Sequence, residues 1–242
     1  VALVTGANRG IGKAIVESLL SHGAAKVYAG ARNPDSLANL VAGSDGKVVP
    51  LKLDVTDQAQ VDAAAAAAPD ATIVINNAGV IANPDLFGGD FAAAEQEFTV
   101  NYFGVLSMSR AFAPILKTRG SGTLVNLSSI AGLSNFPMLV TYSDSKAAVH
   151  SLTQGTRHLL TGSGVNVLGV YPGPVDTDMA KDIEFAKETP DNVADTIIAA
   201  IESGAEEVFT DEMARGYAPA YEAGHKALEL GTREMMAQAA GA

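Results

Sequence analysis

Short apolar runs and helical patterns alternate along this chain. The strand-like runs lie near residues 1–5, 26–31, 47–53, 72–76, 122–128, 164–171 and 206–210. Between them, apolar residues recur at the spacing of one helix face near residues 10–22, 34–41, 57–68, 90–118, 140–161 and 190–203. Such alternation is typical of a parallel sheet covered by helices. We therefore predict a single α/β domain over residues 1–242, a doubly wound parallel sheet with helices on both faces.

Residues that can bind a ligand stand where several predicted strands end. Gly6, Asp54, Asn76, Ser129 and Tyr171 each lie at or just after the end of a strand-like run. The carboxyl ends of parallel strands meet at one edge of a sheet, and that edge is where ligands bind in this class of fold. We expect these residues to meet at one site.

The first of these positions opens a glycine-rich turn, Thr5-Gly6-Ala7-Asn8-Arg9-Gly10-Ile11-Gly12, that leads into a helix. Glycines let the backbone turn sharply and approach a pyrophosphate, whose charge is attracted by the helix N-terminus. Three residues separate the first two glycines and one separates the last two, so the turn departs from the usual dinucleotide-binding spacing. On its own, the turn is either a phosphate site or only a structural device.

Tyr142 and Lys146 are the clearest candidates for chemistry. They stand four residues apart in the predicted helix 140–161, which places the phenol and the ammonium on one face. A phenol titrates near ~10 in water, and a fixed cation beside it would lower its pKa toward neutrality. Taken alone, the pair is more simply a half-buried tyrosine beside a solvated lysine.

Taken together, the motifs resemble the short-chain dehydrogenase/reductase family, in its short one-domain form with a Rossmann fold, over nearly the whole chain. The matching residues are Thr5-Gly6-x-x-x-Gly10-x-Gly12, Asp54, Asn76-Asn77-Ala78-Gly79, Asn101, Ser129, Tyr142-x-x-x-Lys146 and Tyr171-Pro172-Gly173. The resemblance implies that Tyr142 donates a proton to a substrate carbonyl oxygen that Ser129 holds. Ser129 is preferred to Ser128 because the family usually places its serine thirteen residues before the tyrosine. The resemblance also implies that Lys146 binds the nicotinamide ribose and lowers the pKa of Tyr142, while Asn101 supports a water-linked proton relay.

The cofactor implied by the resemblance is a nicotinamide dinucleotide. The residues expected to bind it are Gly6, Asn8, Arg9, Gly10, Ile11, Gly12, Arg32, Asp54, Val55, Asn77, Ala78, Gly79, Tyr142, Lys146, Pro172, Gly173, Val175 and Thr177. Two of these have an alternative role. Asp54 could equally form a turn with Thr56 and Asp57, and a structural role for Asn77 is as plausible as contact with the cofactor.

The end of the second predicted strand indicates which nicotinamide cofactor is used. An acidic residue there would accept the ribose 2′-hydroxyl of NAD, but the position holds Ala31 and is followed by Arg32. A guanidinium suits a phosphate, and Arg9 adds a second cation in the glycine turn. Hydrogen bonds to charged groups contribute ~1.5–3 kcal/mol each. We therefore expect NADP (NADPH), with NAD as the weaker alternative.

Composition and charge exclude several other classes of function. The formal net charge of −11 argues against nucleic acid and anionic membrane surfaces as partners. Although 48% of the residues are hydrophobic, no uninterrupted apolar stretch is long enough to span a membrane. The chain has no cysteine, which removes thiolate catalysis and fits a cytoplasmic location. Its four histidines lack metal-ligand spacing, so we expect no metal site. Because Val1 already lies within a strand-like run, we expect residues to precede it in the natural protein.

The second half of the chain contains the features expected to select the substrate. By resemblance, residues 174–190 form a lid over the substrate. A pocket lined by Phe136, Met138, Leu139 and Met179 would favour a hydrophobic ketone or aldehyde. The chain ends in an acidic, alanine-rich helical tail near residues 218–239, where many members of the family have a glycine-rich segment. By the same resemblance, helices 90–118 and 140–161 pair across a homodimer or homotetramer.

These features predict an NADP-dependent oxidoreductase, a carbonyl reductase or alcohol dehydrogenase acting on a small-molecule substrate. One alternative is an NADP-binding sensor without turnover, although such a protein has no need of Ser129, Tyr142, Lys146 and Asn101 together. Another is an epimerase or dehydratase of the same fold that uses the cofactor transiently. Its sign would be product formation without net oxidation of the cofactor.

Overall fold

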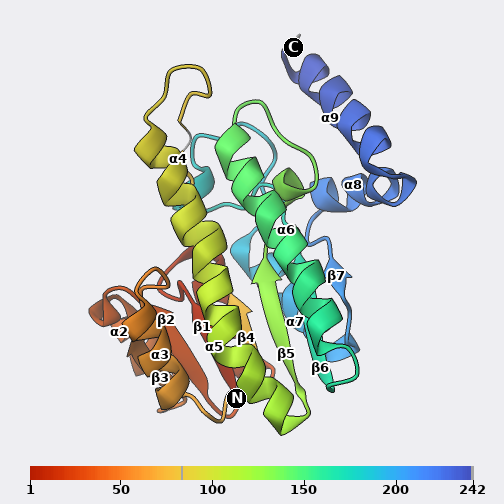
Figure 1. The fold of residues 1–242 in the computed structure, drawn as a ribbon. Coiled ribbons are helices and arrows are strands. Elements are labelled where there is room, and N and C mark those ends of the chain that lie inside the picture. Colours follow the sequence, from red (N-terminus) through yellow and green to blue (C-terminus); the bar gives the residue numbers. More distant parts are fainter. Residues whose placement is uncertain (83, 241–242) are drawn as a thin grey trace.

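A parallel sheet forms the centre of the computed structural model, which describes residues 1–82 and 84–240. Within these residues the sheet has seven strands in the order β3-β2-β1-β4-β5-β6-β7 (Figure 1). The strands are β1 (Ala2–Thr5), β2 (Val27–Ala31), β3 (Val48–Lys52), β4 (Ile73–Asn76), β5 (Gly122–Leu127), β6 (Val165–Val170) and β7 (Glu207–Val208). Every neighbouring pair is parallel. The predicted doubly wound fold is confirmed.

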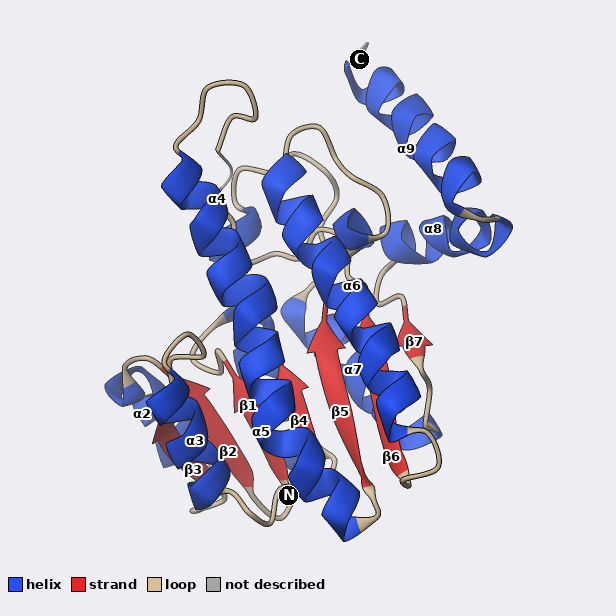
Figure 2. Ribbon diagram, viewed as in Figure 1, coloured by secondary structure: helices blue, strands red, loops and turns tan. Residues whose placement is uncertain are grey.

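Helices cover both faces of this sheet (Figure 2). One face carries α1 (Gly10–Ser21) and α7 (Pro190–Ser203), which pack against each other. The opposite face carries α3 (Gln58–Ala67), α5 (Gly104–Arg119) and α6 (Val140–Leu160). The short helices η1 (Pro34–Leu37) and α2 (Ala38–Ala42) connect β2 to β3, in place of the single predicted helix 34–41. Over the described residues, no helix has the length and apolar character needed to cross a bilayer.

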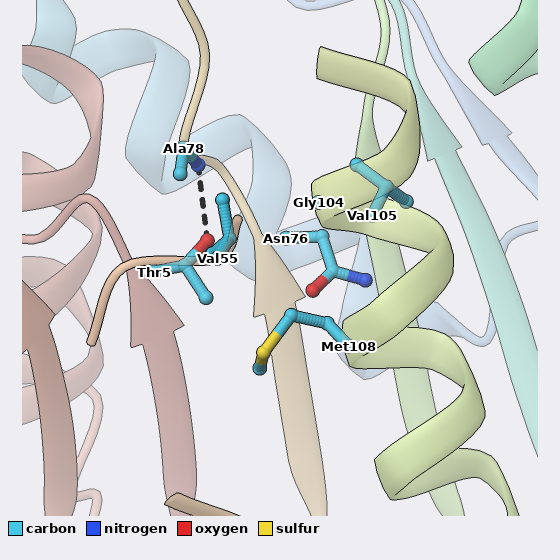
Figure 3. A pocket seen from close by; sticks show the side chains of 7 residues that line it. All are labelled: Thr5, Val55, Asn76, Ala78, Gly104, Val105 and Met108. Carbon is cyan, nitrogen blue, oxygen red and sulfur yellow. Dashed lines mark hydrogen bonds between the residues drawn. The ribbon is translucent and has the colours of Figure 1, made fainter. Parts of the chain in front are cut away.

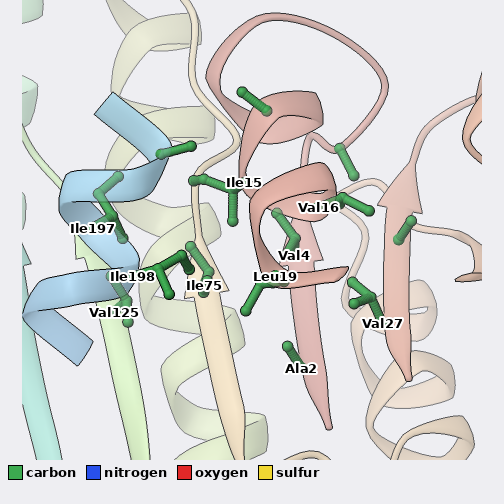
Figure 4. Packing of buried hydrophobic residues seen from close by; sticks show 14 of the residues in the cluster. Ala2, Val4, Ile15, Val16, Leu19, Val27, Ile75, Val125, Ile197 and Ile198 are labelled. Atoms are coloured by element: carbon green, nitrogen blue, oxygen red, sulfur yellow. The ribbon is translucent and has the colours of Figure 1, made fainter. Parts of the chain in front are cut away.

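Side chains that alternate along the strands separate two hydrophobic cores. In β1, Ala2 and Val4 join the core under α1 and α7, whereas Leu3 joins the core under α3 and α5. Figure 4 shows the first core, where Ile15 of α1 and Ile197 of α7 meet over the strands. Full burial of one such side chain stabilises the folded state by about 1.5–3 kcal/mol. The two layers of buried side chains therefore keep the strands, and with them the strand ends, in fixed positions.

The predicted helix 90–118 is present as an unbroken helical segment over residues 91–119, but it is not α-helical throughout. The segment is α4 (Phe91–Glu97), a π-helical stretch η2 (Phe98–Phe103) and then α5. A π-turn inserts an extra residue and keeps a helical pattern on both sides, so apolar spacing does not reveal it. The π-helical stretch contains Asn101, which is fully buried. Such irregular turns often occur at functional sites.

The tail is two helices rather than one. Helix α8 (Glu212–Ala223) and helix α9 (His225–Ala240) are separated by Gly224, whose φ of 111° suits glycine. Leu228 of α9 is buried, and Thr232 Oγ1 donates to Ser134 Oγ over 2.8 Å. The tail therefore packs on the loop that follows Ser129.

Candidate active site

The predicted site residues converge at the carboxyl edge of the sheet. Gly6 follows β1, Asn77 follows β4, Ser129 lies just beyond β5, and Tyr171 follows β6. Strand β1 pairs with β2 on one side and with β4 on the other, so the chain order reverses there. In open α/β sheets such a reversal opens a crevice for the ligand.

Tyr142 and Lys146 lie in the first two turns of α6, and both side chains are buried, with 8% and 5% of their surface exposed. The Lys146 Nζ is 5.7 Å from the centroid of the Tyr142 ring. It donates a hydrogen bond of 2.8 Å to the carbonyl oxygen of Leu127 at the end of β5. The predicted pairing on one helix face is present, with the ammonium tied to the sheet.

Burial determines the titration of both groups. It raises the pKa of Tyr142 to about 12, against a lowering by a hydrogen bond with Ser129, and the nearby charge of Glu97 raises it further. Burial also lowers the pKa of Lys146 to about 8. In this structure the net shift of the Tyr142 pKa is upward, where a lowering was predicted, because desolvation dominates and the Lys146 ammonium bonds a backbone carbonyl instead of the phenol.

The two neighbouring serines have different roles. Ser128 Oγ donates to the backbone oxygen of Lys146 over 2.8 Å and so fastens β5 to α6. Ser129 Oγ donates to Pro172 O over 3.2 Å and accepts from Ala131 N. Ser129, and not Ser128, lowers the pKa of Tyr142, so the structure favours Ser129 as the neighbour of the phenol.

Asn101 connects the π-helical stretch to two neighbouring segments. Its Oδ1 accepts from Val80 N over 2.8 Å, and its Nδ2 donates to Val80 O and to Ser145 Oγ. Ser145 lies in α6 beside Lys146. Asn101 thus holds the strand-end loop after Gly79 against α6.

Glu97 is a buried neighbour of this site that the sequence analysis did not single out. Its Oε1 accepts from Ala82 N over 2.8 Å, and its Oε2 accepts from Thr141 Oγ1, in the residue before Tyr142. Glu97 is fully buried. No sequence signal marks it, since acidic residues in a helix usually face solvent.

The glycine turn brings its backbone segments close together at the N-terminus of α1. Gly6 and Gly10 have φ angles of 64° and 52°, and a Cβ on Gly12 would lie 2.2 Å from Gly6 O. Arg9 at the N-cap makes no capping hydrogen bond, and the first turn of α1 holds no acidic residue. A helix start without a capping oxygen, next to glycine backbone, fits an anion such as a dinucleotide pyrophosphate.

Comparison with known proteins identifies the family. A family model described as short chain dehydrogenase matches residues 1–188. The chain belongs to this family. The dehydrogenase is thus an oxidoreductase, and the fold of this family binds a nicotinamide cofactor.

Two solved structures and one curated relative show how far the similarity extends. A short chain dehydrogenase from Burkholderia cenocepacia in complex with NADP is 42% identical, with a TM-score of 0.87 and 94% of each chain covered. A short chain dehydrogenase/reductase from Burkholderia phymatum in complex with NAD is 28% identical, with a TM-score of 0.81 over 90% of this chain and 91% of that one. The ketoacyl reductase HetN of Nostoc is 32% identical over 224 residues, which are 87% of this chain and 78% of the relative.

The remaining turn residues of the dehydrogenase hold the first and fourth strands together. Asn77 Nδ2 donates to Thr5 O over 2.9 Å, which is the structural role left open by the sequence. Figure 3 shows the recess beneath the turn, where Thr5 Oγ1 accepts from Ala78 N. The other residues lining this recess are Val55, Asn76, Gly104, Val105 and Met108. These residues are mostly apolar, and their side chains lie beneath the turn as a packed support.

The two arginines proposed for a 2′-phosphate are both exposed. Arg32 follows β2, and Arg9 Nη1 lies 3.1 Å from the Asp178 carboxylate. Asp54 Oδ1 accepts from the backbone and hydroxyl of Thr56, so the turn alternative describes its contacts here. Val55 is buried against the glycine at the start of α5.

The segment after β6 lies across the glycine turn. Val175 forms a parallel bridge with Glu188, and the methyl group of Thr177 would be 3.1 Å from a Cβ on Gly10. Three further residues were predicted to contact the cofactor. Asn8 and Ile11 are half-buried in the glycine turn, and Gly79 faces Asn101 and Lys146. The segment is therefore in position to contact a cofactor held by the turn.

The side of the site expected to face the substrate is apolar, and the tail packs on part of it. Phe136 is buried and stacks on Tyr217 of α8, with ring centroids 6.0 Å apart. Leu139 is half-buried in the same cluster, whereas Met138 and Met179 are exposed at 42% and 43%. Of the four residues predicted to line the substrate pocket, Phe136 and Leu139 are packed in the protein, whereas Met138 and Met179 are exposed.

Proposed function

We propose that this dehydrogenase is an NADP-dependent carbonyl reductase or alcohol dehydrogenase that acts on hydrophobic ketones or aldehydes, with Tyr142 as the proton donor. The observation that supports this most is the burial of Tyr142 and Lys146 together in the first two turns of α6, with the Lys146 Nζ 5.7 Å from the centroid of the Tyr142 ring. A tyrosine whose pKa is raised to about 12 keeps its proton at neutral pH. It is therefore in the state that reduction requires.

The nicotinamide supplies the hydride when it is bound. As negative charge develops on the carbonyl oxygen, hydroxyl donors aimed at that oxygen bind it more strongly than they bind the ground state. In this proposal Tyr142 is one such donor, and Ser129 becomes the other once its single hydroxyl hydrogen turns from Pro172 O to the carbonyl oxygen. The Lys146 ammonium, 5.7 Å from the ring, stabilises the phenolate that remains after proton transfer. A positioned proton donor typically contributes about 10²–10⁴-fold in rate.

The proposed substrate class follows from the surroundings of Tyr142. Its neighbours in one hydrophobic cluster are buried or partly buried apolar residues: Ile81, Ile130, Leu133, Phe136, Leu139, Tyr217, Met235 and Met236. These side chains would bury apolar groups flanking a carbonyl. The similarity to a ketoacyl reductase supports a ketone as the reacting group.

The preference for NADP rests on charge at the end of β2. Arg32 and Arg9 are exposed cations, and the acidic residue that would accept the 2′-hydroxyl of NAD is replaced by Ala31. The NADP-bound relative at 42% identity supports this choice more strongly than the NAD-bound one at 28%. We extend the proposal to a homodimer or homotetramer paired through α5 and α6. Phe103, the residue before α5, and Leu159 of α6 are 53% and 79% exposed. The proposed location is the cytoplasm.

The test is consumption of NADPH, with NADH as the comparison, by the purified protein in the presence of hydrophobic ketones, aldehydes and diketones. Faster consumption with NADPH than with NADH, dependent on the carbonyl compound, is the expected result. Tight NADPH binding without consumption would instead favour the cofactor-sensing alternative. Product formed without net loss of NADPH would favour an epimerase or dehydratase.

A further inference from the structure

Asp211 is a buried carboxyl group that links the C-terminal helices to the active site. It precedes α8 and is 3% exposed. Its Oδ1 accepts from Ala214 N over 2.8 Å, which is the usual role of an N-cap residue. Its Oδ2 accepts from Thr210 Oγ1 over 3.0 Å and from Gly173 N over 2.7 Å. The bond to Gly173 lies outside the helix and is not needed to cap it.

The Gly173 amide belongs to the same peptide group that Ser129 contacts. On the carbonyl side of this group, Pro172 O accepts from Ser129 Oγ over 3.2 Å and from Ile130 N over 3.1 Å. On the amide side, Gly173 N donates to Asp211. One peptide plane is therefore held between Ser129 and Asp211.

The contact is too close for a side chain at position 173. A Cβ on Gly173 would lie 2.6 Å from Asp211 Oδ1, so only glycine lets the carboxyl group reach the amide. Carboxylate acceptors make shorter and stronger hydrogen bonds than neutral ones. Hydrogen bonds in a chain also polarise one another, which makes Pro172 O a better acceptor for Ser129.

We propose that Asp211 is a positioning residue for the reaction. Through the Pro172–Gly173 peptide it sets the place of Ser129, and it fixes the start of the segment 174–177 that lies across the glycine turn. The recorded hydrogen bonds of its carboxylate all go to protein groups. The effect of Asp211 on catalysis rests on the function proposed above. Its hold on the Pro172–Gly173 peptide group does not depend on that function.

Two substitutions separate positioning from capping. Asp211→Asn keeps the size and shape of the side chain but replaces one carboxylate oxygen by an NH2 group. At least one of the two backbone N–H groups, of Gly173 or of Ala214, then faces a donor instead of an acceptor. Asp211→Ser keeps a good N-cap for α8 but is too short to reach Gly173 N. The matched control is Asp57→Asn, because Asp57 caps α3 with two backbone bonds and one side-chain bond away from Ser129.

The first readout is hydrogen–deuterium exchange of the Gly173 amide in the protein without cofactor. Loss of a charge-assisted bond should speed this exchange about tenfold or more in both Asp211 variants. The second readout is the single-turnover rate of hydride transfer per bound NADPH, which partial unfolding would not change. A displaced Ser129 should lower that rate about tenfold or more. Asp57→Asn should change neither quantity.

Unchanged Gly173 exchange in Asp211→Ser, or a single-turnover rate within about twofold of the parent, would overturn the proposal. So would equal effects in Asp57→Asn. Should Asp211→Asn fail to fold, Asp211→Ser decides. Should the parent reduce no carbonyl compound, the proposed function fails, while the exchange measurement and the NADPH dissociation constant of each variant still decide the role of Asp211.

Discussion

Replacing Lys146 by Met should stabilise this protein while removing its activity. Lys146 is 5% exposed, and its ammonium lies 5.7 Å from the centroid of the Tyr142 ring and has one protein acceptor, Leu127 O, among the contacts the structure records for it. Methionine has a similar length and no charge, so it can fill the same space. The variant would lose the cation that supports Tyr142 and binds the ribose in the proposed mechanism.

The magnitude follows from the pKa. Burial lowers the pKa of Lys146 from 10.5 to about 8. At about 1.4 kcal/mol per pKa unit, keeping this ammonium charged at pH 7 costs about 3 kcal/mol of folding free energy. The lost hydrogen bond to Leu127 O offsets about 1.5 kcal/mol of that gain. Lys146→Met should therefore raise the free energy of unfolding by about 2 kcal/mol, or the melting temperature by about 4–8 °C.

The sign of the pH dependence provides a second check. Below pH 8 both the folded and the unfolded chain hold the Lys146 proton, so the full cost is present. Between pH 8 and 10.5 the unfolded chain holds more protons than the folded one, and the stability of the parent rises with pH. The advantage of Lys146→Met should shrink across that range.

Urea unfolding of the parent and Lys146→Met at pH 7 and pH 9.5 measures both effects. The control is Lys117→Met, which makes the same change at an exposed position of α5 and should alter stability by less than about 0.5 kcal/mol. If Lys146→Met is less stable than the parent at pH 7, the ammonium is stabilising and the reasoning fails.

Three further substitutions test the proposed roles. Tyr142→Phe should lower carbonyl reduction about 10²–10⁴-fold with little change in NADPH binding by fluorescence titration, and equal loss of both would contradict its role as proton donor. Arg32→Ala should weaken NADPH binding about 10–100-fold without affecting NADH; an unchanged preference would refute the argument for NADP. Glu97→Gln should shift the alkaline loss of reduction rate to lower pH, because the Glu97 charge raises the pKa of Tyr142. An unshifted pH profile would show that Glu97 acts only through its hydrogen bonds.

The elements predicted most accurately are those whose ends have local signals. Helix 190–203 was predicted with the bounds that the structure shows, because Pro190 opens it after the Thr189 cap and Gly204 ends it with a φ of 70°. The convergence of Gly6, Ser129 and Tyr171 was also predictable, since parallel strands bring their carboxyl ends together.

Features that depend on distant contacts were not predictable from the sequence. The π-helical stretch at Asn101 preserves the helical pattern around it and so leaves no trace in the spacing of apolar residues. The raised pKa of Tyr142 depends on burial and on Glu97, which is 45 residues away in the chain. The bond between Asp211 and Gly173 spans 38 residues. An aspartate before a helical pattern signals a cap, but nothing local indicates its second partner.

The central claim is that hydride passes from NADPH to a carbonyl carbon while Tyr142 supplies the proton. The most direct test uses NADPH carrying deuterium at the transferred position, with mass spectrometry of the alcohol formed from a ketone that the protein consumes. Incorporation of one deuterium at the carbinol carbon per NADPH oxidised is the predicted result. An unlabelled product, or a product formed while the label stays on the cofactor, would contradict the account.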